Sequence, residues 1–279
     1  MTLAIVTDST SNISQSVADE LGITIVPLNL IFGEETLLDM KDITPEAFFK
    51  RLTTDPNHPS TSQPSVGAFL DCYNKLIENG ATEILSIHIS KKVSGTYESA
   101  VQASSQISGC KIEVIDSGTI SLPLGFSVLE AAKALKNGKN LDEIKSITAD
   151  ALSRSNIFLS IDTLDYLIRG GRMSKAKGFI GSKLNVKPIL TVEDGLVGQG
   201  GKTRNYKKSI DLMLSKISEL APFAYVGIVH SDAPELAAEA VKALKEIDSN
   251  AEPLVTPLTP VLGVHAGPGA IGFAAIAAK

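Results

Sequence analysis

The sequence predicts an α/β protein of two domains, and three observations lead to that fold class. Short apolar runs alternate with helical patterns through residues 3–153, which is typical of a mainly parallel sheet with helices on both faces. The second half adds a hairpin with an Asp-Gly turn, which indicates a mixed sheet. The chain of 279 residues, 43% of them hydrophobic, is long enough for two cores. We therefore expect an N-terminal domain at 1–155 and a C-terminal α/β domain at 156–279.

Residues 3–6 form a continuous apolar run, as expected for a strand covered on both faces. Caps mark two helix starts: Thr44 followed by Pro45, and Ser65 before apolar residues spaced by three and four. The expected strands are 3–6, 23–26, 84–89 and 111–115, with a hairpin at 29–38, and the expected helices are 14–21, 44–52, 65–80, 94–107, 122–135 and 141–153.

The second half is expected to combine strands, helices and a hairpin. A strand at 157–162 leads into a short helix at 164–168, which the pair Gly170-Gly171 ends. The hairpin at 187–197 turns at Asp194-Gly195. Beyond it we expect a basic helix at 205–220, a strand at 224–229, a helix at 234–247 and an extended, proline-broken segment at 254–264.

Composition argues against several classes of function. Aromatic residues make up 5% of the chain and Trp is absent, which disfavours stacking surfaces for carbohydrate or single-stranded nucleic acid. The net charge of −5 gives no general attraction to nucleic acid.

Cys72 and Cys110 are not spaced as a metal or redox pair and suggest a reducing compartment. No basic leader precedes the first strand, and the apolar run at 267–278 is too short to span a bilayer, so we expect a cytoplasmic protein without metal or cofactor.

Positive charge is concentrated in residues 169–208, here called the basic segment. It holds ten Lys or Arg residues and two acidic ones, Glu193 and Asp194, whereas the whole chain is negative. Segregation of this kind indicates a surface for an acidic partner or for phosphate, although the solvated faces of ordinary helices also produce it.

Two polar segments suggest where an anion binds. At 57–65, Pro59 and Pro64 hold an extended run of Ser, Thr and Gln side chains, which suits an oxygen-rich ligand or a simple linker with a helix cap. At 94 we expect a helix to begin at the sheet edge where ligands bind, and its free amides favour negative charge. Ser94 adds a hydroxyl there, and Gly95 allows a ligand close to the backbone.

Thr61 and a histidine would complete this anion site. His265 precedes a glycine-rich turn that could hold its ring over a cleft, and a hydrogen-bonded core histidine is the other interpretation. The alternative function is a serine hydrolase or acyltransferase that uses Ser94 with Asp116 and His265, but Lys92 stands where the nucleophile elbow needs Gly. The glycine-rich match at 267–272 has no βαβ unit after it, so it is not a dinucleotide site.

Six short motifs resemble those of one family and occur in its order along nearly the whole chain. They are Val-Thr-Asp-Ser-Thr at 6–10, Thr-Ser-Gln-Pro-Ser at 61–65, Val-Ser-Gly-Thr-Tyr at 93–97, Gly-Gly-Arg-Met-Ser at 170–174, Lys-Pro-Ile-Leu at 187–190 and His-Ala-Gly-Pro-Gly-Ala at 265–270. In these motifs the chain resembles the DegV family, whose members include the fatty-acid-binding subunits of bacterial fatty acid kinase.

The resemblance implies a fold of two α/β domains with a lipid between them. The acyl chain would lie in an apolar tunnel, with its carboxylate near the surface. The resemblance assigns Arg172 and Arg204, both in the basic segment, to contact with the kinase or with the acyl phosphate. The carboxylate site that it implies consists of Thr61, Ser94 and His265. Their neighbours Gly95 and Ser62 are expected to belong to the same site.

The implied function is that of a carrier and not an enzyme. The protein would bind a long-chain fatty acid such as palmitate and present its carboxylate to a separate ATP-dependent fatty acid kinase, which forms the acyl phosphate for fatty acid metabolism and phospholipid synthesis. The expected partners are the fatty acid and the kinase subunit, with transient contact to a membrane surface and none to nucleic acid. Lys91 and Lys92 stand where the family commonly has small residues, and they would strengthen anion binding or change which partner docks.

Overall fold

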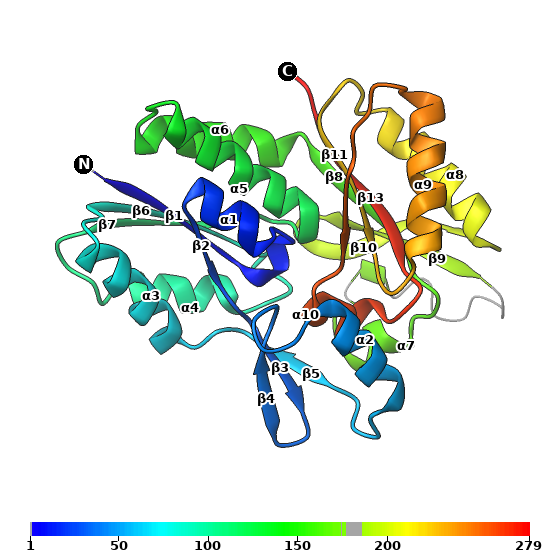
Figure 1. Ribbon diagram of the computed structural model, residues 1–279, viewed down its shortest axis with the longest axis horizontal. Coiled ribbons are helices and arrows are strands. Elements are labelled where there is room, and N and C mark those ends of the chain that lie inside the picture. The colour runs from blue at the N-terminus through cyan, green and yellow to red at the C-terminus, as the bar shows by residue number, and fades with distance from the viewer. Residues whose placement is uncertain (1, 174, 177–185) are drawn as a thin grey trace.

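The computed structural model describes residues 2–173, 175–176 and 186–279, which form three sheets surrounded by helices (Figure 1). A parallel sheet belongs to the first half of the chain and a mixed sheet to the second. A small antiparallel sheet from the first half packs against helices of the second. The predicted α/β class, with a parallel sheet followed by a mixed one, is confirmed.

The first sheet is all parallel and has helices on both faces. Its strands are β1 (Leu3–Asp8), β2 (Ile23–Val26), β6 (Glu83–His88) and β7 (Lys111–Asp116), and its helices are α1 (Gln15–Leu21), α3 (Val66–Glu78), α4 (Thr96–Ser104), α5 (Ser121–Lys136) and α6 (Leu141–Ser153). The strand order is β2-β1-β6-β7. Successive strand residues face opposite layers, since Ile5 packs with α1, α5 and α6 whereas Val6 packs with α3.

The second sheet is mixed, and its order is β10-β9-β8-β13-β11-β12. Its elements are β8 (Ser155–Ser160), β9 (Lys187–Glu193), β10 (Leu196–Thr203), α8 (Tyr206–Ser218), β11 (Phe223–His230), α9 (Pro234–Ile247), β12 (Leu254–Pro257) and β13 (Ile271–Ala277). Only β11 and β12 pair in parallel among the described strands of this sheet. Helices α8 and α9 cover its outer face, on the right of Figure 1, and α5 packs on its inner face.

The small sheet joins the first half of the chain to helices of the second half. It contains β3 (Asn29–Phe32), β4 (Glu35–Leu38) and β5 (Ser60–Ser62), and it lies beside α2 (Pro45–Thr54), α7 (Asp165–Arg169) and α10 (Pro260–Ala266). Phe48 and Phe49 of α2 share a core with Val264 of α10. Gly263 of α10 has room for no side chain, because a Cβ there would stand 2.6 Å from the Phe48 ring. This close packing brings β5 against α10.

The structure differs from the sequence expectation at four places. Helix α4 begins at Thr96 with Gly95 as its N-cap, and not at Ser94, because the Ser94 hydroxyl accepts a hydrogen bond from the Thr96 amide in a local turn. Part of the 57–65 loop is a strand, β5, paired with β3. The segment 254–264 is not extended throughout, since Pro260 starts α10. The apolar C-terminal run contains β13, a central strand that the sequence analysis did not identify.

The expected domain boundary at 153–156 falls between α6 and β8. Residues 29–62 nevertheless pack against α10 of the second half. Division of the chain into domains at 155 therefore stays a prediction.

Candidate functional site

A cavity lies between the carboxyl end of the parallel sheet and the inner face of the mixed sheet. Its empty volume is about 930 Å³, its open mouth included. Leu28, Ile89 and Ile120 enter it from the segments that follow β2, β6 and β7, which is where open α/β sheets bind ligands. Its apolar lining consists of Leu28, Ile89, Val93, Ile120, Ile157, Leu159, Leu167, Leu190, Val192, Val197, Leu258, Val261, Leu262 and Ala266.

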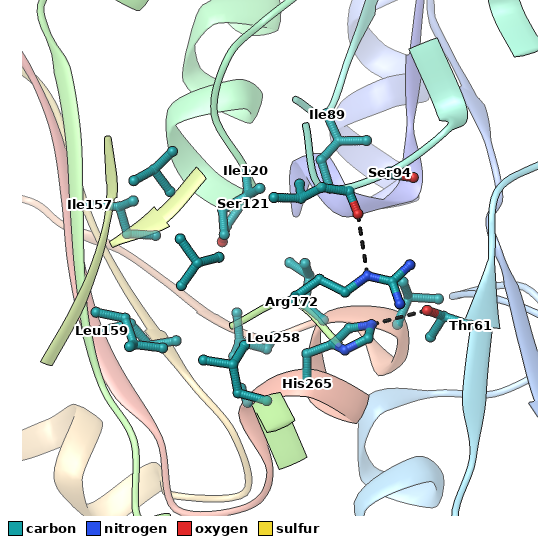
Figure 2. Close-up of a pocket in the computed structure, with 18 of the residues that line it drawn as sticks. Thr61, Ile89, Ser94, Ile120, Ser121, Ile157, Leu159, Arg172, Leu258 and His265 are labelled. Carbon is teal, nitrogen blue, oxygen red and sulfur yellow. Dashed lines mark hydrogen bonds between the residues drawn. The ribbon is translucent and has the colours of Figure 1, made fainter. Parts of the chain in front are cut away.

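One end of the cavity is polar. Thr61 on β5 and His265 in the last turn of α10 meet there, with 3.0 Å between Thr61 Oγ1 and His265 Nε2 (Figure 2). Ser94 and Arg172 line the same end, while Ile157 and Leu159 lie at the opposite, apolar side of the view. A cavity that is apolar over most of its surface and polar at one end suits an amphipathic molecule.

His265 is neutral at physiological pH. Burial lowers the pKa of its imidazole to about 4, with further lowering by the charge of Arg172 and by His58. Its Nδ1 atom has no hydrogen-bond partner among the described residues. An unpaired buried N–H costs more than an unpaired lone pair, so we assign the proton to Nε2, which then donates to Thr61 Oγ1. The Thr61 hydroxyl hydrogen is thereby free to point at a ligand.

Gly170 fixes the position of the His265 ring. A Cβ at position 170 would stand 2.0 Å from His265 Nδ1. Only glycine therefore fits at this position beside the imidazole ring. The sequence analysis treated Gly170 as a helix end, and it is the residue after α7. Its closeness to His265 depends on the packing of α7 against α10, which no local pattern shows.

Arg172 brings a positive charge to the polar end. Its Nε donates to the Val93 carbonyl at 3.3 Å, and its Nη1 donates to the Gly170 carbonyl at 2.5 Å. These bonds hold the guanidinium at the cavity and leave further N–H groups for a ligand. No carboxylate within the described ranges forms a salt bridge with Arg172. A ligand carboxylate would supply the missing counter-charge.

The other expected carboxylate residues surround this end. Ser94 lines the cavity, and its hydroxyl lies 2.8 Å from that of Thr96. Ser62 also lines it, and its hydroxyl accepts a bond from Asn29 Nδ2 at 3.1 Å. Gly95 is not among the lining residues but leaves room for the Gln63 side chain, which is 3.1 Å from the place of its missing Cβ. The residues expected from the sequence are thus gathered at or beside one end of the cavity.

The two arginines that the sequence analysis grouped together lie in different surroundings. Arg172 lines the cavity, whereas Arg204 is exposed in the turn between β10 and α8. Part of the positive charge of the basic segment is neutralised, since Lys175 pairs with Asp194 at 2.7 Å and Lys187 pairs with Asp162. Ser174, Lys177 and Lys183 lie outside the described residues.

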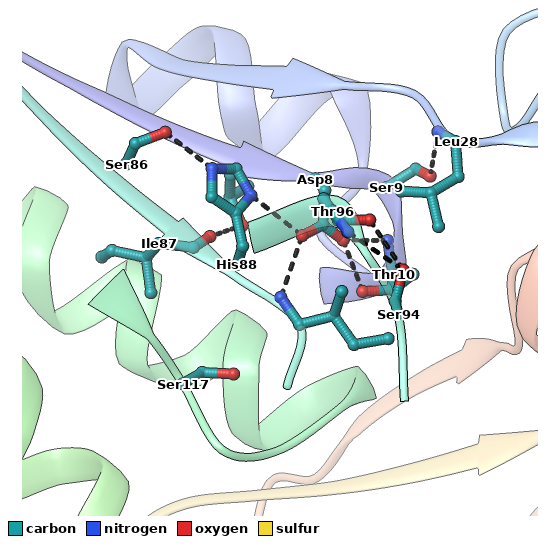
Figure 3. Close-up of polar contacts among 12 residues, drawn as sticks. Asp8, Ser9, Thr10, Leu28, Ser86, Ile87, His88, Ser94, Thr96 and Ser117 are labelled. Atoms are coloured by element: carbon teal, nitrogen blue, oxygen red, sulfur yellow. Dashed lines mark hydrogen bonds and ion pairs between the residues drawn. The ribbon is translucent and has the colours of Figure 1, made fainter. Parts of the chain in front are cut away.

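A serine, a histidine and an aspartate are hydrogen-bonded in series elsewhere, in the core of the parallel sheet (Figure 3). Asp8 Oδ2 lies 3.0 Å from His88 Nδ1, and His88 Nε2 lies 2.6 Å from Ser86 Oγ. The order of these groups matches a hydrolase triad. All three side chains are fully buried and none lines the cavity, so no substrate reaches them. The Asp8 carboxylate instead holds the Ile89 amide at 3.0 Å, at the cavity wall.

Ser94 has the surroundings of a binding group and not of a nucleophile. Its hydroxyl bonds Thr96, while His265 bonds Thr61. Asp116 Oδ1 accepts from the backbone amides of Lys91 and Gly118. Within the part of the chain that the structure describes, Ser94 has no histidine base at hydrogen-bond distance, which the hydrolase alternative requires.

Asp39 is a site-supporting residue that sequence reasoning missed. Its Oδ1 accepts the backbone N–H of Val261 at 3.1 Å and so caps the first turn of α10, the helix that carries His265. Burial raises the pKa of this carboxyl to about 6. The two residues are far apart in sequence, and only the folded chain brings them together.

None of the helices in residues 2–173, 175–176 and 186–279 is both long enough and apolar enough to cross a membrane.

Comparison with known proteins gives a consistent result. The family model described as "Uncharacterised protein, DegV family" matches residues 2–278. A DegV domain-containing protein of Halalkalibacterium halodurans is 33% identical over 274 residues, 97% of each chain. One of Staphylococcus aureus is 35% identical over 272 residues, 96% of each chain.

Solved structures similar to this chain are described as fatty acid binding. A DegV family protein from Thermus thermophilus, described by its fatty acid binding, is 32% identical with a TM-score of 0.92, and each chain is covered fully. DegV from Bacillus subtilis, a fatty acid binding protein, is 30% identical with a TM-score of 0.91 over 99% of each chain. A stearic acid-binding protein from Eubacterium ventriosum is 28% identical with a TM-score of 0.90, over 99% of this chain and 98% of that one.

Proposed function

Since this chain belongs to the DegV family, we propose that it binds a long-chain fatty acid in the cavity between its two main sheets. The observation that carries the proposal is a cavity that is apolar along its length and has Thr61, Arg172 and a neutral His265 at one end. Such a cavity matches an alkyl chain that ends in a single carboxylate.

The alkyl chain supplies most of the affinity in this proposal. Each methylene group removed from water contributes about 0.8 kcal/mol, so a chain of palmitate length gains several kcal/mol beyond the cost of binding. Polar groups at the mouth fix its direction. The Thr61 hydroxyl donates one hydrogen bond to the carboxylate, Ser94 donates a second, and the Arg172 guanidinium supplies the opposite charge.

Arg172 is assigned here to the carboxylate of the fatty acid, whereas the sequence expectation for it was contact with the kinase or with the acyl phosphate. Its guanidinium stands in the cavity lining, beside His265. Arg204 and the exposed lysines of the basic segment remain the groups proposed to contact a separate kinase, because they are outside the cavity. The protein would then be a non-catalytic carrier whose bound carboxylate is phosphorylated by that kinase.

The proposed place of action is the cytoplasm, with transient contact to a membrane from which the fatty acid is taken. Cys72 and Cys110 are both free, which fits a reducing compartment. This role serves fatty acid metabolism and lipid transport.

Extraction of bound lipid from the purified protein, followed by mass spectrometry, tests the proposal. We expect a long-chain fatty acid at near-equal molar ratio, and uptake of added palmitate by protein that has been stripped of lipid. A purified protein that is empty and also takes up no palmitate would contradict the proposed function.

A further inference from the structure

A second hollow lies behind the cavity, on the other side of the start of α5. It opens to solvent and has an empty volume of about 1390 Å³, open solvent included. Leu122, Phe126 and Leu129 of α5 form one apolar wall, and Leu254 and Val255 of β12 form another. The last two are each 43% exposed and are among the few large hydrophobic side chains on the surface of the described residues. The hollow thus has an apolar part next to the cavity, and polar residues that include Asp248 and Glu252 complete its lining.

One pair of hydrogen-bonded side chains connects the lining of the cavity to the lining of the hollow. Ser121 lines the cavity and Asn12 lines the hollow, and the Ser121 hydroxyl donates to Asn12 Oδ1 at 2.8 Å. Asn12 Nδ2 also donates to the Pro257 carbonyl at 2.8 Å. Figure 2 shows Ser121 in the cavity wall, beside Ile120. The Asn12 side chain therefore joins the first half of the chain to the second at this wall.

The backbone at this wall has the left-handed conformation, which most residues other than glycine adopt only at a cost in free energy. Asn12 has a φ of 57° and Ser121 a φ of 58°, and both residues are buried. A serine in the left-handed region costs free energy that surrounding contacts must offset. Helix α5 is pressed against the same segment, since a Cβ on Gly125 would stand 2.2 Å from the Ser11 carbonyl oxygen. The packing thus holds Asn12 and Ser121 together at a conformational cost.

We propose that the Asn12–Ser121 pair is a partition that limits the length of the acyl chain which this protein accepts. With the partition in place, the methyl end of the ligand stays within the cavity. Without it, the cavity joins the hollow, and the end of a longer chain lies against Leu122 and Phe126. This inference rests on the proposed binding of fatty acids at the cavity.

Two substitutions remove the partition with little strain. Asn12→Gly deletes both hydrogen bonds, and Ser121→Gly deletes the hydroxyl that donates to Asn12. Glycine adopts positive φ readily, so neither change opposes the local backbone. Asp232→Gly is the matched control, because Asp232 also has a positive φ of 50° but is exposed and lines neither space. Thermal unfolding of each variant checks that it is folded.

The experiment is competitive loading of stripped protein with palmitate and docosanoate, which is longer by six methylene groups, followed by mass spectrometry. We expect Asn12→Gly and Ser121→Gly each to raise the bound ratio of docosanoate to palmitate about tenfold or more over the native protein, and Asp232→Gly to leave it unchanged. If Asn12→Gly does not fold, the bound ratio of docosanoate to palmitate in Ser121→Gly alone tests the partition.

The outcomes separate this inference from the function on which it rests. A native protein that binds palmitate, with unchanged ratios in both glycine variants, overturns the partition and leaves the proposed function standing. Weaker binding of both acids without a change of ratio also overturns it. A native protein that binds neither acid overturns the proposed function and the partition together.

Discussion

At the residue scale, the histidine at the polar end of the cavity is not charged. Burial and the neighbouring Arg172 lower the pKa of His265 to about 4, so the ring serves as a neutral donor to Thr61. Among the described residues that line the cavity, Arg172 is then the single one with a charged side chain. In the proposed function, the carboxylate would meet one cation and hydroxyl donors, without a second charge that would have to be desolvated.

Thr61→Val tests the hydroxyl at nearly constant volume. We expect fatty acid affinity to fall by about tenfold, because the carboxylate loses a donor and His265 Nε2–H loses its acceptor. Titration with a fluorescent fatty acid measures the change. Thr36→Val is the control, since Thr36 lies on β4 of the same small sheet but outside the cavity lining. Native affinity in Thr61→Val would remove Thr61 from the site.

Arg172→Gln and Arg204→Gln separate the two arginines by function. The first should weaken palmitate binding by tenfold or more, because a charge-assisted hydrogen bond contributes about 1.5–3 kcal/mol. The second should leave binding unchanged and lower acyl phosphate formation when a fatty acid kinase is added. Isothermal titration and the coupled assay report the two effects. Full palmitate affinity in Arg172→Gln would remove Arg172 from the carboxylate site and leave the roles that the sequence analysis expected, contact with the kinase or with the acyl phosphate.

At the scale of elements, α10 is held at both ends by residues from the first half of the chain. Asp39 accepts the Val261 amide at its start, and Thr61 bonds His265 in its last turn. Between them, Gly263 lies against the rings of Phe48 and Phe49. The position of His265 therefore depends on residues that are distant in sequence.

Asp39→Asn should change how stability depends on pH. The folded-state pKa of Asp39 is raised from 3.8 to about 6, so its contribution to stability is fully present below the unfolded pKa and is lost as pH rises through about 6. Asparagine carries no such penalty. Between about pH 5 and about pH 7.5, we expect the unfolding free energy of the variant to rise by about 1 kcal/mol relative to the native protein. Urea unfolding at both pH values measures it, and a constant difference would contradict the role of Asp39.

Local sequence predicts the elements that carry their own signals. Helix α9 was expected at 234–247 and spans Pro234–Ile247, and the hairpin of β9 and β10 turns at Asp194-Gly195 as expected. Strand β13 was missed because its residues Ile271 to Ile276 are all buried, so no alternation marks it. Helix α10 was missed because the prolines of 254–264 were taken to break that segment, although Thr259-Pro260 repeats the helix start seen at Thr44-Pro45.

The same distinction applies to the candidate site. Thr61, Ser94 and His265 stand in motifs, and the structure brings Thr61 and His265 to 3.0 Å and Ser94 to the same end of the cavity. The apolar lining of the cavity could not be predicted from a motif. Residues such as Ile120 and Leu159 line the cavity only because the two sheets pack together. The role of Arg172 could not be separated from that of Arg204 by charge alone.

At the scale of the whole molecule, the cavity belongs to both halves of the chain. Thr61 and Ser94 come from the first half, and Arg172 and His265 come from the second. A ligand that touches all four binds only the folded arrangement and so stabilises it by mass action. The size of this stabilisation should depend on the charged carboxylate end of the ligand.

Palmitate and its methyl ester should therefore stabilise the protein to different extents. At a free concentration about 100 times its dissociation constant, palmitate should add about 2.7 kcal/mol to the unfolding free energy and raise Tm. The ester has the same alkyl chain but no charge for Arg172, so a smaller rise is expected at equal free concentration. Calorimetry on stripped protein measures both. Equal rises would show that the carboxylate does not reach Arg172 and Thr61, and no rise with palmitate would exclude the cavity as a fatty acid site.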